Sequence, residues 1–471
     1  MYRKVKIITT IGPSSGNYDT IYKLIQEGVD GFRINFSHGE PKQWDEWIKM
    51  VREVSTKLEK EVALIGDIPG PQIRIGNLPV QEIKAKETVK LVFGEETNEM
   101  KTIPIPIKKV FEILELGDTL LIDDGRVILR IIDIGEKEAE AIVLNDATLY
   151  PRKTLVVFGK EVDLPVITAK DIELLKYSVS RDLTFIAISF VRRQNDVLIV
   201  KDLLNRLGGK INIISKIETR SAVRNLKEII EVSDAIIIAR GDLGMHFSLE
   251  EIPRIQRKIA RESIMLGKPS IVATQLLESM INYPRPSRSE VVDVVNAVYD
   301  LVDALLLTDE TAIGKYPVEA VKWLKRIIAS AESTIIMDQV MKIREKTKLE
   351  TLREKYAIGL ILLAEKINCK VLIFTKTSTI PPLISRFRPQ VPVYVGTINK
   401  KIAEKLAIYY GIKPYTLSQV PPDKTIDYDQ GVRLLYNYLK NREEITYGEI
   451  IAEAYGRRET EIHEIKIRQV I

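Results

Sequence analysis

The sequence has 471 residues, which corresponds to about three domains of ordinary size. Its 70 Lys and Arg residues are nearly balanced by 65 Asp and Glu residues, and a net charge of +5 is too small for a protein built mainly to bind nucleic acid. The longest stretch without a charged residue, residues 7–18, is far shorter than the roughly 20 apolar residues of a membrane-spanning helix. The single cysteine, Cys369, excludes an intrachain disulfide and a cysteine metal cluster. We therefore expect a folded cytoplasmic protein with neither a nucleic-acid nor a membrane partner.

Eight short apolar runs that are rich in β-branched residues are predicted to be strands. They cover residues 5–11, 31–37, 62–67, 185–190, 211–217, 235–240, 269–274 and 304–308. Helical patterns separate them, as in repeated βα units. Eight such units predict a (β/α)8 TIM barrel, a fold of the α/β class.

The regular spacing of the runs is interrupted between the third and the fourth. Residues 88–93 and 118–134 alternate apolar and polar side chains, and turn signals such as Asp124-Gly125 lie between such segments. This pattern predicts an all-β domain, a small β-barrel over residues 69–164, inserted into a barrel formed by residues 1–68 and 165–332. The βα rhythm restarts after residue 332 with different lengths, so residues 333–471 are predicted to form a separate C-terminal α/β domain.

Charged side chains gather at the carboxyl ends of the predicted strands, where barrel enzymes place their active sites. Lys216 and Glu218 close the fifth run and point the same way, because side chains alternate along a strand. Asp242 follows the sixth run, and the two carboxylates can hold Mg²⁺ when substrate oxygens complete its coordination. Lys216 and Arg33 add positive charge. The set predicts a Mg²⁺-dependent enzyme for a small anionic substrate, working by phosphoryl transfer or by enolate chemistry.

Several segments resemble the motifs of the pyruvate kinase family, in the family's order and spacing. They are RINFSHG at residues 33–39, IPGPQIRIG at 68–76, DDG at 123–125, IISKIETRSAV at 213–223, ARGDLG at 239–244, ATQLLESM at 273–280, RPSRSE at 285–290 and TDETAIGKYPVEAV at 308–321. The resemblance covers about the first 330 residues.

The resemblance implies transfer of the phosphoryl group of phosphoenolpyruvate to ADP, which gives pyruvate and ATP. It implies that the inserted domain is a lid and the C-terminal domain is regulatory. Lys216 would stabilise the transferring phosphoryl group and the enolate, and Arg33 would hold the phosphoryl group. Glu218 and Asp242 would bind Mg²⁺ or Mn²⁺, and the amides of Gly241 and Asp242 would receive the substrate carboxylate.

The same resemblance implies further roles. Thr274, which would also contact the substrate, and Thr308 would help to protonate the enolate carbon. The residues that would contact the nucleotide are Asn35, His38, Arg74 and Lys153, of which Lys153 is carried by the lid. The residues that match the family's monovalent-cation pocket are Asn35, Ser37, Asp67 and Ile68.

The chain departs from the family pattern at two places that concern ligands. Gln72 stands where K⁺-requiring members usually have a glutamate, and the missing negative charge leads us to expect weak or absent activation by K⁺. Residues 375–379 occupy the position of the family's phosphate loop and keep hydroxyls and a lysine but no glycine. A fructose bisphosphate site is therefore not expected, and a different phosphorylated effector near Thr375 and Thr379 is the hypothesis.

The resemblance also implies a homotetramer. Two other functions are weighed against pyruvate kinase activity: a Mg²⁺-dependent lyase or aldolase that handles pyruvate enolate on the same kind of barrel, and a non-catalytic metabolite-sensing module. A lyase would not need a lid that carries Lys153. The intact Lys216, Glu218, Asp242 and Thr274 argue against a non-catalytic module.

Overall fold

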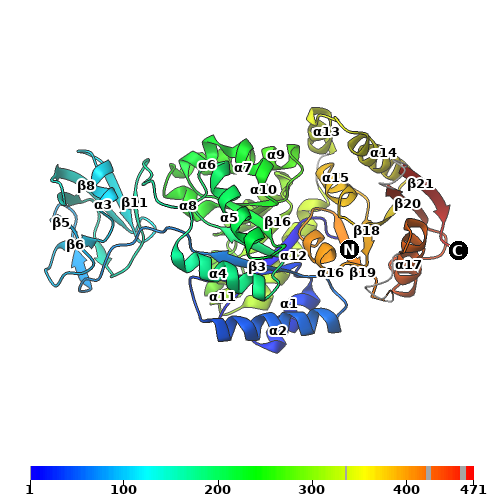
Figure 1. The fold of residues 1–471 in the computed structure, drawn as a ribbon, viewed down its shortest axis with the longest axis horizontal. Coiled ribbons are helices and arrows are strands. Elements are labelled where there is room, and N and C mark those ends of the chain that lie inside the picture. The colour runs from blue at the N-terminus through cyan, green and yellow to red at the C-terminus, as the bar shows by residue number, and fades with distance from the viewer. Residues whose placement is uncertain (1, 335–336, 419, 421–425, 457–462) are drawn as a thin grey trace.

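The computed structural model describes residues 2–334, 337–418, 420, 426–456 and 463–471. Three bodies lie in a row along the long axis of the molecule: the inserted domain at one end, the large barrel in the middle and the C-terminal domain at the other end (Figure 1). Within the described ranges, no helix combines the length and the apolar character that are needed to cross a bilayer.

The middle body is a closed barrel of eight parallel strands, so the predicted TIM-like fold is confirmed. In chain order, its strands are β1 (Lys6–Ile11), β2 (Gly31–Asn35), β3 (Ala63–Ile68), β12 (Phe185–Ile188), β13 (Asn212–Ile217), β14 (Ala235–Ala239), β15 (Ser270–Ala273) and β16 (Ala304–Leu307). Around the barrel, the order is β1-β16-β15-β14-β13-β12-β3-β2. β3 and β12 are therefore neighbours, although the whole inserted domain lies between them in the chain.

Both faces of the barrel strands are apolar, which explains why the strands read as continuous apolar runs and not as alternating patterns. Ile65 and Phe185 belong to the set that fills the barrel interior, whereas Ile186 and Ile236 pack outward under the helices. All four side chains are at most 1% exposed.

Several strands end one or two residues before the carboxyl end that the sequence predicted for them. Phe190 and Thr274, for example, lie just beyond β12 and β15, with φ values of 55° and 70°. This left-handed backbone conformation is incompatible with a β-strand and turns the chain across the mouth of the barrel.

Helices surround the barrel and connect its strands. They are α1 (Tyr18–Glu27), α2 (Pro41–Lys57), α4 (Ala169–Ser180), α5 (Gln194–Arg206), α6 (Arg220–Arg224), α7 (Leu226–Val232), α8 (Arg240–Gly244), α9 (Ile252–Met265), α10 (Arg288–Tyr299), α11 (Asp309–Ala312) and α12 (Pro317–Glu332). Short-range signals set several starts: α4 and α10 each begin with a capping box, in which Thr168 pairs with Asp171 and Ser287 with Glu290.

The inserted domain contains eight strands and one short helix, α3 (Lys108–Ile113). The strands are β4 (Gln81–Ile83), β5 (Thr88–Phe93), β6 (Thr102–Ile105), β7 (Thr119–Ile122), β8 (Val127–Ile134), β9 (Glu138–Val143), β10 (Ala147–Leu149) and β11 (Leu155–Val157), together with an isolated bridge between Arg74 and Thr154. Instead of one closed small barrel, they form a six-stranded sheet, β11-β7-β8-β9-β5-β6, and a two-stranded ribbon, β10-β4. The ribbon and α3 complete the core of the sheet, because Ile83, Leu149 and Phe111 pack into it.

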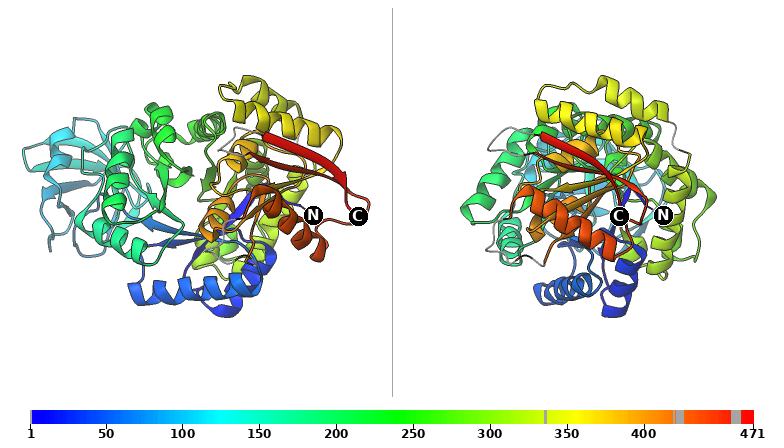
Figure 2. Two further views of the ribbon diagram at one scale, coloured as in Figure 1. Left: turned by 45° about the vertical axis from the view of Figure 1, so that its right-hand side comes forward. Right: turned by 90° about the vertical axis from the view of Figure 1, so that its right-hand side faces the viewer.

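The C-terminal domain is an α/β sandwich with helices on both faces of a five-stranded sheet (Figure 2). The sheet has the order β19-β18-β17-β20-β21, and β21 is antiparallel to β20. The strands are β17 (Lys370–Phe374), β18 (Val393–Thr397), β19 (Ile412–Thr416), β20 (Ile450–Gly456) and β21 (His463–Gln469). The helices are α13 (Met337–Lys346), α14 (Leu352–Lys366), α15 (Ile380–Arg386), α16 (Lys400–Leu406) and α17 (Tyr428–Asn441).

The C-terminal domain packs on the amino ends of the barrel strands, away from the mouth. Asp303 precedes β16 and forms a buried ion pair with Arg388, at 2.7 Å between Oδ2 and NH2. Its carboxylate also accepts the backbone N–H groups of Ser270 and Tyr410. The barrel and the C-terminal domain are therefore joined through the buried carboxylate of Asp303, both oxygens of which accept hydrogen bonds.

Candidate active site

The centre of the barrel mouth is occupied by Lys216, near the end of β13. Its Nζ lies 2.7 Å from Glu218 Oε1 and 3.7 Å from Asp67 Oδ1, and it donates a 2.9 Å hydrogen bond to Ser189 Oγ. Burial disfavours the charged lysine, but the carboxylates of Asp67, Glu218 and Asp242 outweigh that effect and raise the pKa of Lys216. The ammonium is thus a fixed positive charge in the mouth.

Arg33 lies on β2, beside this cluster. Its Nε donates to Asp67 Oδ2 at 2.6 Å, and its NH1 donates to Thr10 Oγ1 at 3.1 Å. Asp67, on β3, therefore stands between the two cations, Arg33 and Lys216, and is itself only 3% exposed. The three strands β1, β2 and β3 hold the guanidinium in place through side chains that share one face of the sheet.

Glu218 and Asp242 form the acidic part of the site. Glu218 is 1% exposed, and its Oε2 accepts the backbone N–H of Phe190 at 2.7 Å. Burial, together with the negative charge of Glu218, raises the pKa of Asp242 to about 7. Two carboxylates that repel one another in this way fit a divalent cation with oxygen ligands. Within the described residues, no group of three or more His, Cys, Asp or Glu side chains is arranged to hold a metal ion.

The turn after β15 places Thr274 against the start of α8. Thr274 Oγ1 accepts the backbone N–H of Gly241 at 2.9 Å, so this amide bonds to Thr274 in the present arrangement. The sequence interpretation gave no role to Arg240, which is 8% exposed and donates to the carbonyls of both Thr274 and Gln275. Arg240 thereby holds the left-handed turn at Thr274. The position of Arg240 inside the ARGDLG motif was the one feature of the sequence that could have indicated this role.

Thr308 lies directly after β16, which is the strand next to β15 and Thr274 in the barrel. Its backbone N–H and its hydroxyl both approach Glu310 Oε2, at 2.8 and 3.3 Å. The other oxygen of Glu310 accepts the N–H of Leu277 at 3.0 Å, and burial raises the pKa of the Glu310 carboxyl. Glu310 thus fixes Thr308 relative to the chain that follows Thr274.

The residues of the expected monovalent-cation pocket lie along the ends of β2 and β3. Asn35 Oδ1 accepts the N–H of Ser37 at 3.1 Å, and Ser37 and His38 are exposed in the loop that follows. The Ile68 carbonyl accepts a 2.8 Å hydrogen bond from Ser189 Oγ. The indole N–H of Trp44 donates a 3.0 Å hydrogen bond to the backbone carbonyl of His38 and so fixes the main chain there.

Arg74 and Lys153, the two cationic candidates of the inserted domain, form polar contacts within that domain. Lys153 Nζ lies 2.9 Å from Asp123 Oδ1, and Arg74 donates to the Arg152 carbonyl at 2.9 Å and to the side chain of Gln72. The structure therefore does not bring Arg74 and Lys153 into contact with Lys216 or Glu218. A cavity of about 80 Å³ lies between the lid and the barrel and is lined from both sides, by Asp124 and Thr154 and by Asp242 and Met245 among others.

The loop of residues 375–379 lies in the C-terminal domain, between β17 and α15. The hydroxyl of Thr375 accepts the N–H of Ser378 at 3.1 Å, and the hydroxyls of Thr377 and Thr379 are 2.9 Å apart. Lys376 Nζ lies 4.8 Å from the ring centre of Tyr428. The loop thus groups several hydroxyls with one lysine, far from the barrel mouth (Figure 1).

Comparisons with known proteins agree with this geometry. The family model "Pyruvate kinase, barrel domain" matches residues 2–321, and "Pyruvate kinase, alpha/beta domain" matches residues 354–463. The chain is 36% identical over 468 residues to a pyruvate kinase of Aeropyrum pernix, which covers 99% of both chains. A pyruvate kinase of Geobacillus stearothermophilus is 36% identical over 435 residues, which is 91% of this chain and 73% of that protein.

Solved structures of the same family have the same fold. The pyruvate kinase of Cryptosporidium parvum superposes with a TM-score of 0.93 at 31% identity, over 99% of this chain and 96% of that one. The pyruvate kinase of Pyrobaculum aerophilum gives a TM-score of 0.87 at 33% identity, over 99% and 100%. Sequence and structure agree across the whole chain, which therefore belongs to the pyruvate kinase family of glycolytic kinases.

Proposed function

We propose that the chain transfers the phosphoryl group of phosphoenolpyruvate to ADP and thereby forms pyruvate and ATP, with Mg²⁺ as the divalent cation and Mn²⁺ as a substitute. The family as a whole depends on a divalent metal. The observation that supports the proposal most directly is the arrangement of Lys216 between Glu218 and Asp67, with Arg33 on the far side of Asp67. Two fixed cations and a metal-binding carboxylate pair meet the needs of a transferring phosphoryl group, because such transfer depends mainly on positioning and on charge neutralisation.

The first half of the reaction is assigned to Arg33 and Lys216. When the bond between phosphorus and the enol oxygen breaks, negative charge develops on that oxygen, and the buried ammonium of Lys216 stabilises it. Arg33 uses Nε for Asp67 and one N–H of NH1 for Thr10. Its other guanidinium N–H groups hold the phosphoryl oxygens. Glu218 and Asp242 would hold Mg²⁺, which would supply positive charge against the negative charge of the substrates. The new bond forms to a β-phosphate oxygen of ADP.

The second half is protonation of the enolate carbon. Thr274 Oγ1 accepts the amide proton of Gly241, so that bond leaves its own proton available to donate. Thr308, oriented by Glu310, can extend the donor chain on the same side of the mouth. A hydroxyl relay suits this step because the conjugate enolate is a strong base, so no histidine is required.

The remaining ligand assignments follow the family motifs. We propose that the amides of Gly241 and Asp242 receive the substrate carboxylate after Thr274 shifts, and that Asn35, His38, Arg74 and Lys153 contact the nucleotide once the lid moves toward the barrel. Weak activation by K⁺ at Asn35, Ser37, Asp67 and Ile68 stays a prediction. So do the homotetramer, the cytoplasmic location, and the binding of a phosphorylated effector at residues 375–379.

One assay tests the reaction. Pyruvate is measured by a coupled enzyme from phosphoenolpyruvate, with ADP and Mg²⁺ each omitted in turn. We expect pyruvate and ATP in equal amounts, and only when both ADP and Mg²⁺ are present. Formation of pyruvate at the same rate without ADP would contradict the proposal and would favour a lyase or a hydrolase on this barrel.

A further inference from the structure

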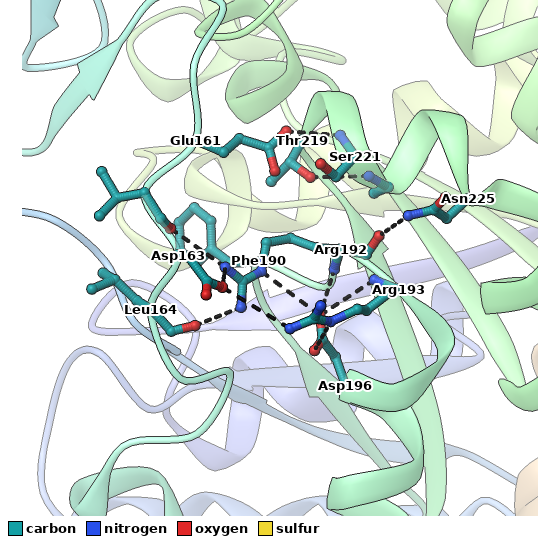
Figure 3. Close-up of polar contacts among 12 residues, drawn as sticks. Glu161, Asp163, Leu164, Phe190, Arg192, Arg193, Asp196, Thr219, Ser221 and Asn225 are labelled. Atoms are coloured by element: carbon teal, nitrogen blue, oxygen red, sulfur yellow. Dashed lines mark hydrogen bonds and ion pairs between the residues drawn. The ribbon is translucent and has the colours of Figure 1, made fainter. Parts of the chain in front are cut away.

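The lid returns to the barrel through a linker, residues 158–168, which connects β11 to α4. The side chain of Arg192 forms hydrogen bonds to this linker (Figure 3). Its NH1 donates to the Val162 carbonyl at 3.4 Å and to Asp163 Oδ1 at 2.8 Å, and its NH2 donates to the Leu164 carbonyl. One planar guanidinium therefore bonds to three consecutive residues of the linker, a geometry that its forked donors allow and a lysine does not.

Arg192 is itself held firmly by the barrel. Its backbone N–H donates to Asp196 Oδ2 at 2.9 Å, and its carbonyl accepts Asn225 Nδ2 at 2.8 Å. Asp196 is 3% exposed, and the Arg192 side chain is 14% exposed. Because both its main chain and its side chain are fixed, Arg192 can act as a rigid support for the linker.

The turn that carries Arg192 also touches the active site. Ser189 accepts a hydrogen bond from Lys216, and the left-handed Phe190 donates its N–H to Glu218 Oε2. A stretch of four residues, from Ser189 to Arg192, thus contacts the central lysine, the metal-binding carboxylate and the lid linker (Figure 3 shows the Phe190 and Arg192 end). The position of the linker and the position of Glu218 therefore depend on one short turn.

Two other contacts define the hinge on either side. The N–H of Ser221, which follows β13, donates to Glu161 Oε1 of the returning linker at 2.7 Å. On the outgoing side, the N–H of Gly70 donates to the buried Asp171 at 3.3 Å, and Gly70 has a φ of 67°. The outgoing chain is therefore held by α4, while the returning linker is held by the loops after β12 and β13.

We propose that Arg192 is a positioning residue for catalysis. It fixes the returning hinge of the lid, so that Arg74 and Lys153 contact the nucleotide at the correct position relative to Glu218. The part that concerns the nucleotide rests on the proposed function. The phosphoenolpyruvate pocket, with Arg33 and Lys216, belongs to the barrel alone. Loss of the Arg192 contacts therefore affects ADP use more than phosphoenolpyruvate use.

The kinetic test compares Arg192→Gln with Arg193→Gln. Arg193 is a matched control, since it is the adjacent arginine, is 58% exposed, and forms ion pairs with Asp163 and Asp196 at 4.0 and 3.5 Å. We expect Arg192→Gln to raise KM for ADP by about tenfold or more and to lower kcat by about tenfold, because small errors of position are costly in group transfer. KM for phosphoenolpyruvate should stay within about threefold, and Arg193→Gln should change each constant by less than about threefold.

A distance measurement separates this inference from the identity of the reaction. The native Cys369 is 1% exposed, so spin labels can be attached selectively to Glu136→Cys on the lid and Lys49→Cys on α2, both on exposed side chains. We expect the distribution of label distances to broaden in Arg192→Gln and to stay unchanged in Arg193→Gln. This result does not depend on which substrates the enzyme uses.

The proposal is overturned if Arg192→Gln matches Arg193→Gln in both the ADP constants and the distance distribution. If Arg192→Gln does not fold, as judged by its melting curve, Arg192→Lys replaces it in both experiments. A lysine keeps the charge but cannot bond to three linker residues at once, so an intermediate rise in KM for ADP supports the proposal and wild-type constants with a wild-type distribution overturn it.

Discussion

Replacing Lys216 with methionine deletes an ammonium group that lies 2.7 Å from Glu218 and 3.7 Å from Asp67, while most of the side-chain volume is kept. Removal of one positioned charge from a preorganised site typically costs about 2.7–4 kcal/mol of transition-state stabilisation, or about 10²–10³ in kcat. The larger end is expected here, because the three carboxylates around Lys216 would then act on the developing enolate without the ammonium that lies among them. Pyruvate formation from phosphoenolpyruvate and ADP, at saturating Mg²⁺, gives kcat directly.

Two controls make the Lys216 experiment decisive. Lys227→Met removes an exposed lysine of α7 that is 3.9 Å from Glu231, and it should leave kcat unchanged. A Mg²⁺-dependent rise in melting temperature should persist in Lys216→Met, because Glu218 and Asp242 remain. If Lys216→Met retained more than about a tenth of the wild-type kcat while still folded, the assigned role of the ammonium would be wrong.

Three further predictions concern cations and pH. Replacing K⁺ by a large organic cation at constant ionic strength should lower kcat by less than about tenfold, because Gln72 lacks the charge that attracts K⁺; a loss of about a hundredfold would show a K⁺-dependent enzyme. Glu218→Gln should weaken Mg²⁺ binding by at least about tenfold, measured by titration of the melting temperature as well as of activity, and an unchanged midpoint would argue against the carboxylate pair as the metal site. Burial lowers the pKa of Lys6 from 10.5 to about 8, so its protonated form is disfavoured in the folded state. The unfolded chain then binds more protons between about pH 8 and 10.5, and stability relative to Lys6→Met should rise across that window, by at most ~3 kcal/mol in denaturant unfolding; a difference that does not change with pH would contradict this.

The barrel was predictable because its chemistry repeats along the chain. Strands that are buried on both faces read as apolar runs, and the charged residues that follow them mark the mouth. The exact strand ends were not predictable, since the left-handed turns at Phe190 and Thr274 depend on partners that are distant in sequence. Thr274, for example, is held by Arg240, and Phe190 is held by Glu218.

Contacts between distant segments account for the rest of what sequence patterns missed. Arg192 appears in the chain as one of two adjacent arginines with no pattern to distinguish them, and only the fold shows which of them reaches the linker. The buried pair of Asp303 and Arg388, which joins the barrel to the C-terminal domain, is equally invisible in sequence. Motifs fix the residue types of a site, whereas supports of this kind are set by the tertiary packing that brings separate loops together.

The place of the insertion would allow the proposed lid to move without disturbing the barrel. β3 and β12 pair directly, with Ile65 beside Phe185 and Ile68 beside Ile188, so the barrel closes without any contribution from the inserted residues. The chain leaves the barrel directly after β3, and the returning linker leads into α4 and contacts Arg192, which lies shortly after the neighbouring strand β12. The proposed motion of the lid would therefore change the proposed nucleotide side of the site and leave the strand pairing that positions Lys216 intact. It follows that damage to the hinge should appear mainly in the constants for ADP, and damage to Lys216 mainly in kcat, so the two variants should separate kinetically if the division of the site between lid and barrel is correct.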